Sequence, residues 1–364
     1  MRYTSFAGSL VATSALIANI AHADLASCAR IVADSQRLAC YDALAEPQVY
    51  GSGSPAAAAM PGTADVATSA AIAPPSTPAT ASLALSPGAG PAADSEAARL
   101  RASWELDPDA QRGTFRLLPH RPLYALLHAT SRVNSNPQSP TRTSDSASPI
   151  ELQHVDTKLQ LSFKSKLAQD ILGSASDLWF GYTQQSYWQA INSRYSSPFR
   201  ESNYEPEAIV VRPLQFGVGP IHAAYAAVSL NHQSNGQGGA LSRSWNRVIG
   251  DVALTAGPFS MQLRPWLRLD ASADNHDDNP DIEDFVGRGE VVAGYRSGRH
   301  VVILRGRHSL RSGARSRGSA QLDWAYRLAG TLNAHVQLFT GYGESLIDYN
   351  LRQTTLGVGL SFFD

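Results

Sequence analysis

The amino-acid sequence predicts an all-β protein: a twelve-stranded antiparallel transmembrane β-barrel, preceded by a small Cys-paired helical hairpin and a disordered linker. Three observations lead to this fold class. The first residues form a secretory signal, and a long stretch of small residues and proline follows. After residue 120, about twelve segments alternate between large apolar and small or polar residues, as strands of a membrane barrel do.

Residues 1–23 have the composition of a signal peptide. Arg2 supplies a positive charge, a short apolar stretch runs from Phe6 to Ile20, and Ala21-His22-Ala23 is a small-x-small cleavage site. Because a helix needs ~20 apolar residues to cross a bilayer, this interrupted stretch is too short to be an anchor. We expect the mature chain to begin at Asp24. An ordinary N-terminal helix and lipidation at Cys28 are the alternatives.

Two cysteines, Cys28 and Cys40, lie close to the expected mature N-terminus. On one continuous helix their Cα atoms would be ~18 Å apart, whereas a disulfide requires ~4.4–6.8 Å. A bridge therefore needs a turn, for which Ala33-Asp34-Ser35 is suitable. We expect residues 24–46 to form a helical hairpin that secretion allows to be disulfide-bonded; two free thiols are the alternative.

Residues 47–98 consist almost entirely of Ala, Pro, Ser, Thr and Gly. Such a segment has too little bulky apolar surface to offset the entropy of ordering, so we expect a disordered linker. The charged stretch from Glu96 to Glu105 suggests a short helix that leads into the barrel domain, residues 99–364.

The barrel domain shows a two-residue period. In residues 355–362, 223–230 and 247–254, even positions are mostly large and apolar, and odd positions are mostly small or polar. Even positions such as Val228, Leu230 and Val252 should therefore face lipid, and odd positions such as Arg247 and Asp251 the lumen. A soluble β-sandwich would also alternate, but its outward face would be charged. Here the charged residues share the face of the small residues, opposite the large aliphatics, which favours the barrel. Aromatic residues near segment ends are expected at the membrane interfaces: Trp179, Tyr182, Trp188, Trp266, Trp324, Tyr342, Phe362 and Phe363.

Composition excludes two other classes. The net charge is −1 and no Lys/Arg cluster occurs, which argues against a nucleic-acid-binding surface. No later segment approaches 18 uninterrupted apolar residues, so transmembrane helices are not expected.

The segment from Asn231 to Arg247 carries the candidate chemistry. Its glycines at 236, 238 and 239 predict a turn between two strands, and a turn centred on residue 239 pairs His232 with Asn246. Their Cβ atoms would then be ~4.5–5.5 Å apart, and Ser234 would share the face of His232. These are a nucleophile, a general base and a group that orients the base. All three lie on the lipid-facing parity, where polar groups are unfavourable unless a substrate arrives from the membrane. A chance Ser/His/Asn cluster at the barrel rim is the alternative.

This segment resembles the active-site signature of the bacterial outer-membrane phospholipase A family. The resemblance covers roughly residues 120–363 and includes four further stretches: Tyr182-Thr183-Gln184, Ser196-Ser197-Pro198-Phe199-Arg200-Glu201-Ser202-Asn203-Tyr204-Glu205-Pro206, Asp277-Asp278-Asn279-Pro280-Asp281-Ile282 and Gly341-Tyr342-Gly343-Glu344-Ser345-Leu346-Ile347-Asp348-Tyr349-Asn350.

The resemblance implies a twelve-stranded barrel and calcium-dependent hydrolysis of phospholipid and lysophospholipid acyl esters, of the phospholipase A1/A2 type. By position, Ser234 is then the nucleophile, His232 the base and Asn246 its orienting partner. Calcium would polarise the ester carbonyl and so supply the charge stabilisation that an Asn-based triad lacks. Residence in the outer membrane of a Gram-negative bacterium is implied as well, and we expect the N-terminal extension to be periplasmic.

The implied calcium ligands are the Ser242 hydroxyl, the Gln237 backbone carbonyl and the Ser196 carbonyl of a second protomer. Catalysis would then depend on a homodimer, and Gln184 matches a polar residue at its interface. Asp278 matches an acidic residue linked to calcium in the inactive monomer.

Two positions depart from the family pattern. A basic residue is common where Gln237 stands, but its loss should be tolerated because only the carbonyl is a ligand. An Asp is common where Gly239 stands, which puts a calcium site in the monomer in doubt. The acidic cluster 277–281 could alternatively be a simple solvated loop with no role in calcium binding.

Two other functions remain open from the sequence. One is a catalytically silent structural barrel or narrow pore, and the other is a periplasmic binding module in the N-terminal hairpin, with the barrel as its anchor.

Overall fold

The computed structural model describes residues 28, 30–33, 36–37, 40, 96–143, 151–171, 173, 175–194, 199–269 and 277–362. The chain divides into two units, Met1–Ser82 and Leu83–Asp364. The expected signal peptide, residues 1–23, lies outside the described residues, as does the expected linker up to residue 95.

A disulfide links Cys28 and Cys40 in the N-terminal unit, with their Cα atoms 5.6 Å apart. Residues 28, 36–37 and 40 are helical, whereas residues 30–33 are not. The Ile31 N–H donates to the Cys28 carbonyl, and the Arg37 N–H donates to the Ala33 carbonyl. The chain thus turns between the cysteines, as the geometry of a bridge requires, and the alternative of two free thiols is wrong.

The first described elements of the second unit are the helix α3 (Glu96–Ser103) and the 3-10 turn η1 (Pro108–Ala110). No helix among the described residues is long and apolar enough to cross a membrane. The strands follow: β1 (Leu117–Pro119), β2 (Leu123–Thr130), β3 (Val155–Ile171), β4 (Ser176–Trp188), β5 (Glu201–Val218), β6 (Ile221–Ser234), β7 (Ser244–Ala256), β8 (Phe259–Leu269), β9 (Gly289–Ser297), β10 (His300–His308), β11 (Gly318–Ala329), β12 (Leu332–Gly341) and β13 (Gln353–Phe362).

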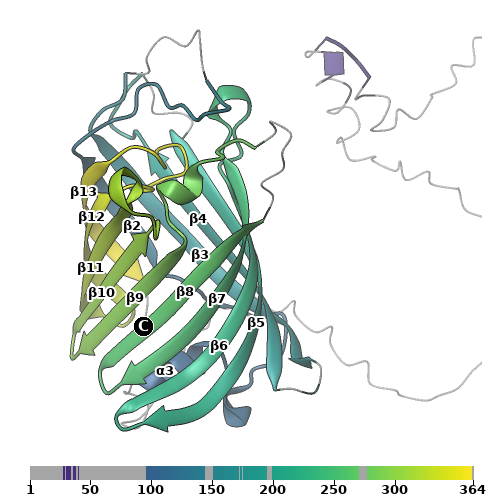
Figure 1. Cartoon of the computed structure of the whole chain (residues 1–364), viewed down its shortest axis with the longest axis vertical. Helices are drawn as coiled ribbons and strands as arrows, with labels where there is room; N and C mark the ends of the chain where they lie inside the picture. Colours follow the sequence, from purple (N-terminus) through teal and green to yellow (C-terminus); the bar gives the residue numbers. More distant parts are fainter. Residues whose placement is uncertain are drawn as a thin grey trace, which may run out of the picture. The chain divides into compact units, whose positions relative to one another are not determined.

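Strands β2 to β13 form a closed twelve-stranded antiparallel barrel. Each strand pairs with the next along the chain, and β2 pairs with both β3 and β13, which closes the sheet (Figure 1). The short β1 pairs with residues 163–165 of β3, whereas β2 pairs with residues 155–160 of the same strand. β1 therefore extends the line of β2 along β3. Closure leaves no unpaired edge among these strands, which a sheet in lipid requires. The predicted fold class is confirmed.

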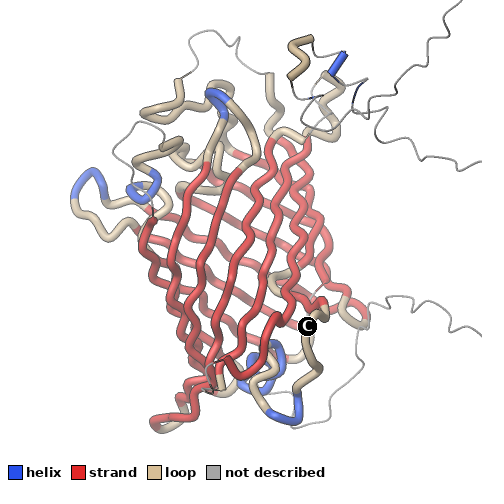
Figure 2. Tube along the Cα trace, turned by 90° about the vertical axis from the view of Figure 1, so that its right-hand side faces the viewer, coloured by secondary structure: helices blue, strands red, loops and turns tan. Residues whose placement is uncertain are grey.

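The two ends of the barrel differ. Four of the five turns at one end, between strands such as β5 and β6, are two residues long, and Gly219, Gly257 and Gly330 adopt a positive φ there. Such tight turns need glycine because other residues resist that conformation. Longer connections, including the 3-10 turns η2 (Gly239–Leu241), η3 (Ile282–Asp284) and η4 (Gly313–Arg315), lie at the other end (Figure 2). This loop end carries the candidate site.

The barrel wall follows the predicted parity. Val228 and Leu230 are 56% and 59% exposed on the outer surface, whereas Ser229 between them is 6% exposed. Tyr225 and Arg247 are buried in the interior. The prediction that all the aromatic residues lie at the membrane interfaces is wrong for Trp179 and Trp266. Both are buried inside the barrel, because their positions in β4 and β8 have the inward parity.

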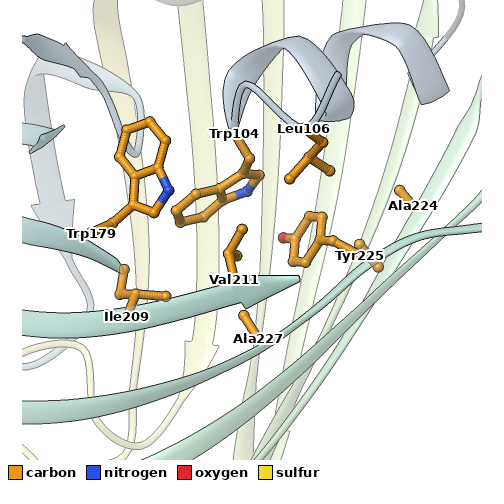
Figure 3. Packing of buried hydrophobic residues seen from close by; sticks show 9 residues of the cluster. Trp104, Leu106, Trp179, Ile209, Val211, Ala224, Tyr225 and Ala227 are labelled. Atoms are coloured by element: carbon orange, nitrogen blue, oxygen red, sulfur yellow. The ribbon is translucent and has the colours of Figure 1, made fainter. Parts of the chain in front are cut away.

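The lumen near the short-turn end is filled by a cluster of buried residues around Trp104. The Trp104 indole packs edge-to-face against Trp179 and Tyr225, with ring centroids 5.6 and 5.7 Å apart, and Figure 3 shows these rings between the α3 segment and the wall. The Lys164 ammonium lies 3.4 Å from the centroid of the Trp104 ring. The segment that follows α3 therefore enters the barrel and packs inside it. The short helix expected before the barrel is present as α3.

Farther along the lumen the side chains are charged and paired. Arg121 binds Glu205 through two N–O contacts of 3.0 and 3.1 Å. Arg247 also binds Glu205, at 3.2 Å, and His120 contacts Glu207 at 2.9 Å. Because an unpaired buried charge is very unfavourable, this pairing allows charged residues to occupy the interior while the outer wall stays apolar.

We expect a fluorophore at position 228 to report a lipid environment and one at position 229 a lumenal environment, because adjacent residues of a strand point to opposite faces. A Val228→Arg substitution should cost ~2–4 kcal/mol if residue 228 lies near the bilayer midplane, whereas Ser229→Ala should cost less. Emission spectra and quenching by lipid-bound quenchers, measured in vesicles, would check this. The reverse order of environments would contradict the register.

Candidate active site

His232 and Asn246 are brought together by the pairing of β6 with β7. The register places the two residues opposite each other, and the His232 Nδ1 lies 2.7 Å from the Asn246 Oδ1. An amide oxygen can only accept, so the His232 Nδ1 carries the proton in this contact. The Nε2 lone pair is then free to accept a proton, which is the tautomer that a general base needs.

Ser234 lies two residues after His232, on the same face of β6, and is paired with Ser244 of β7. This face is the lipid-facing wall. Leu230 precedes His232 on the same parity, and Leu269 of β8 is the neighbour of Asn246 on the other side. His232 is exposed and Ser234 is half-buried, so both can meet a molecule that approaches along the wall. The predicted trio is thus gathered at the loop end of the outer wall.

The loop between β6 and β7 is organised by the buried Asn235. Its Oδ1 accepts the N–H groups of Arg243, at 2.9 Å, and of Gln237, at 3.3 Å. Its Nδ2 donates to the Leu241 carbonyl at 2.8 Å. Gly239 within this loop has φ +61°, in the left-handed region that glycine adopts without strain. Glycine therefore suits the backbone at this position.

Ser242 is held by an acidic side chain from another loop. Its hydroxyl donates to the Asp278 Oδ2 at 2.7 Å, and the Ser244 hydroxyl donates to the same oxygen at 3.1 Å. The other oxygen, Oδ1, binds Arg142 at 2.6 Å. Burial raises the pKa of the Asp278 carboxyl, but the hydrogen bonds from Ser242, Arg142 and Ser244 outweigh this effect and leave the pKa below its ordinary value. Asp278 is therefore a carboxylate at neutral pH.

The acidic loop 277–281 is not a simple solvated loop. Asp277 binds Arg268 through both carboxylate oxygens, each at 2.6 Å. Asp281 accepts a hydrogen bond from the Tyr349 hydroxyl at 2.5 Å. Burial, followed by this contact with Asp281, raises the pKa of Tyr349. Each of these side chains is committed to a protein partner, so the loop is fixed against its neighbours.

The remaining expected ligands are placed only in part. Ser196 lies outside the described residues. The side chain of Gln237 donates to Glu201 at 2.7 Å, a role that the sequence did not indicate. Within the described part of the chain, no group of three or more His, Cys, Asp and Glu residues could hold a metal ion. A cation at this end would thus depend on hydroxyl and carbonyl oxygens in addition to a carboxylate.

Gln184, the expected interface residue, takes part in a row of polar groups on the outer wall of β4 and β5. The Tyr182 hydroxyl donates to the Gln184 Oε1 at 3.0 Å, and the Gln184 Nε2 donates to the Ser186 hydroxyl at 3.1 Å. Ser186 in turn shares a hydrogen bond of 2.8 Å with Ser202 of β5. Polar groups on a lipid-facing surface are unusual, and here they satisfy one another.

Sequence reasoning missed Arg142, Ser244, Glu201 and Asn235. Asn235 had a signal, because it follows Ser234 directly and Asn-Gly marks a turn. Arg142 lies 136 residues from Asp278, its partner. No local pattern could have indicated that contact.

Comparisons with known proteins agree with this geometry. The family model described as phospholipase A1 matches residues 100–362. The phospholipase A1 of Klebsiella pneumoniae is 35% identical over 250 residues, 69% of this chain and 83% of that protein. For the phospholipase A1 of Escherichia coli K12, the identity is 34% over 250 residues, 69% of this chain and 82% of that protein.

Two solved structures are similar throughout the barrel. The outer membrane phospholipase A of Escherichia coli superposes with a TM-score of 0.62 at 32% identity, over 70% of this chain and 94% of that one. The outer membrane phospholipase of Salmonella typhi, solved as a dimer with bound calcium, gives a TM-score of 0.63 at 32% identity, over 71% and 95%. The family match, the identities and the shared barrel lead to one conclusion: this chain belongs to the phospholipase A1 family of outer-membrane β-barrel enzymes.

Proposed function

We propose that this protein hydrolyses the acyl esters of phospholipids and lysophospholipids at the outer membrane, with phospholipase A1 and A2 activity, through Ser234, His232 and Asn246. The observation that carries the proposal is the 2.7 Å contact between the His232 Nδ1 and the Asn246 Oδ1, with Ser234 two residues after His232 on the same lipid-facing side of β6. An acyl ester in the adjacent leaflet can reach this site without leaving the membrane.

The chemistry follows that of a serine hydrolase. The His232 Nε2 takes the proton of the Ser234 hydroxyl while the Ser234 Oγ attacks the ester carbonyl carbon. The C–O bond to the glycerol oxygen then breaks, and His232 returns the proton to that oxygen, which leaves the acyl group on Ser234. Water, deprotonated by the same His232, releases the fatty acid. Asn246 holds the imidazole in the required tautomer throughout.

Calcium fits the donor set at this site. The side chains of Ser242, Ser244 and Asp278 offer only oxygen atoms, which calcium prefers. The Ser242 and Ser244 hydroxyls lie 2.7 and 3.1 Å from the Asp278 Oδ2. When bound by the Ser242 hydroxyl and the Gln237 and Ser196 carbonyls, calcium would polarise the ester carbonyl as a Lewis acid. Asn246 contributes no full charge that could stabilise a protonated His232. Calcium would supply charge stabilisation in the transition state that the Asn-based triad lacks. Asp278, which positions Ser242, is a candidate for contact with the ion as well.

A homodimer would complete the site. The Salmonella typhi relative is a dimer with bound calcium, and the expected Ser196 ligand would come from a second protomer. The polar row Tyr182–Gln184–Ser186–Ser202 on the outer wall supports this assembly, because polar groups in lipid are better accommodated against another protein surface.

The orientation in the membrane follows from loop length. Outer-membrane barrels have short periplasmic turns and longer external loops. The loop end, with Ser234, would then face outside and act on lipids of the outer leaflet. The two-residue turns, α3 and the disulfide-linked N-terminal segment would be periplasmic.

Replacing the nucleophile tests the triad. Ser234→Ala should lower acyl release by at least about a thousandfold, because no covalent route remains. Asn246→Ala should have a smaller effect, about ten- to a hundredfold, since His232 keeps its chemistry and loses its orientation. Acyl release from mixed micelles of phospholipid and detergent would be measured with calcium present.

The matched control is Ser229→Ala, which removes a hydroxyl from the lumenal face of the same strand. It should keep wild-type turnover. Near-wild-type turnover of Ser234→Ala would instead overturn the assignment of the nucleophile. Absence of turnover in the unmodified protein would favour a silent barrel or a narrow pore.

Calcium binding and dimerisation should depend on each other. If two protomers supply the ligands, calcium must favour the dimer by the same factor by which the dimer favours calcium. Ser242→Ala should therefore raise the calcium concentration needed both for activity and for dimerisation. Cross-linked dimer and acyl release would be followed together across a calcium titration.

Ser312→Ala, in an exposed loop at the same end, is the control and should change neither curve. Full activity in a strictly monomeric sample treated with chelator would refute the proposed calcium dependence and dimer.

A further inference from the structure

Glu201, the first residue of β5, carries a buried carboxyl group outside the proposed catalytic trio. Its side chain is 1% exposed. Its two oxygens accept hydrogen bonds from four N–H groups, all of them neutral: those of Asn203, Asn235, Gln237 and Ile347. Buried polar oxygens are unfavourable unless hydrogen bonds satisfy them in this way, so these bonds constrain the groups that donate them.

The partners of Glu201 belong to two loops. One oxygen, Oε1, accepts the backbone N–H of Ile347 at 3.1 Å, in the loop between β12 and β13. The other, Oε2, accepts the Gln237 Nε2 at 2.7 Å and the Asn235 Nδ2 at 3.4 Å, in the loop between β6 and β7. One carboxylate at the end of β5 therefore joins both loops to the barrel wall.

Neither Asn235 nor its loop can adjust freely around this contact. The Asn235 Oδ1 is already committed to two backbone N–H groups, so its amide cannot turn over without losing both. The same loop follows Ser234 directly and contains Gln237 and Ser242. A change at Glu201 is thus passed to the residues from which the proposed calcium ligands come.

We propose that Glu201 is a positioning residue, which sets the conformation of the loop 235–243 through Asn235 and Gln237 and thereby the affinity of the site for calcium. This inference rests on the proposed function, because it concerns the same site. It also changes the view of Gln237. Its side chain, and not only its carbonyl, contributes to the site, because it is one of the two groups that tie the loop to Glu201.

The polarity of the contact provides a sharp test. In Glu201→Gln, an NH2 group can face Asn235 and Gln237. The Asn235 amide, held by its Oδ1 contacts, can only donate there, so the loop loses an acceptor. Adding Gln237→Glu restores one donor–acceptor pair with reversed polarity and returns the net charge to its original value. If Glu201 served only to fill space, adding Gln237→Glu would not restore the calcium affinity lost in Glu201→Gln.

The experiment compares Glu201→Gln, Glu201→Ala and the double variant Glu201→Gln/Gln237→Glu in the full-length protein. Calcium affinity is measured by titration calorimetry on a Ser234→Ala background, where turnover does not interfere, and the calcium dependence of acyl release is measured with Ser234 present. The control is Asp323→Asn, a buried carboxylate that binds His335 and Gln337, far from this loop in sheet order.

Loss of a hydrogen bond to a buried carboxylate should weaken calcium binding about tenfold in Glu201→Gln and at least as much in Glu201→Ala. The rate at saturating calcium should change much less than the calcium requirement. The double variant should recover most of the affinity, and Asp323→Asn should keep it. If Glu201→Ala fails to fold, the nearly isosteric Glu201→Gln and its rescue decide the question.

Wild-type calcium affinity in Glu201→Gln, or a double variant no better than Glu201→Gln alone, would overturn the proposal while the triad and the calcium dependence stand. An unmodified protein that hydrolyses lipid but binds no calcium would overturn both the proposed calcium dependence and the role of Glu201. A loss in Asp323→Asn equal to that in Glu201→Gln would show a general effect of buried carboxylates and would also contradict a specific role.

Discussion

The antiparallel register between β6 and β7 is the constraint on which the site depends. Backbone groups in a membrane must find partners within the protein, so the ladder is continuous and the barrel is closed. The same ladder sets His232 opposite Asn246 and leaves Ser234 on their face. A shift of β6 by one residue would turn His232 and Ser234 into the lumen and leave Asn246 on the outer wall. The requirement that stabilises the barrel is thus also the one that assembles the trio.

The distribution of charge allows the active groups to lie outside rather than in the lumen. Ion pairs such as Arg121–Glu205, together with the cluster around Trp104, fill the interior. A filled lumen has no space for a lipid chain, whereas the outer wall offers a row of aliphatic side chains beside His232. Polar groups on that wall pair with one another in the Tyr182–Gln184 contact, and His232 pairs with Asn246.

The loop end owes its geometry to contacts between segments far apart in the chain. Asp278 joins Arg142 to Ser242, and Glu201 joins the β6–β7 loop to the β12–β13 loop. Strand pairing alone would leave these connections free to move. Because several acidic side chains are shared between loops, the conformation of each loop depends on the others, and a ligand that binds one of them would affect all.

The sequence by itself determined the barrel, the inward and outward faces of its strands and the meeting of His232 with Asn246, because these follow from a two-residue period and one short turn. It also indicated the conditions for the disulfide between Cys28 and Cys40, but not whether it forms. Only the tertiary structure decided the burial of Trp179, the entry of Trp104 into the lumen and the partners of Asp278 and Glu201. These depend on which distant segments meet when the sheet closes, and a local pattern carries no information about residues more than a hundred positions away.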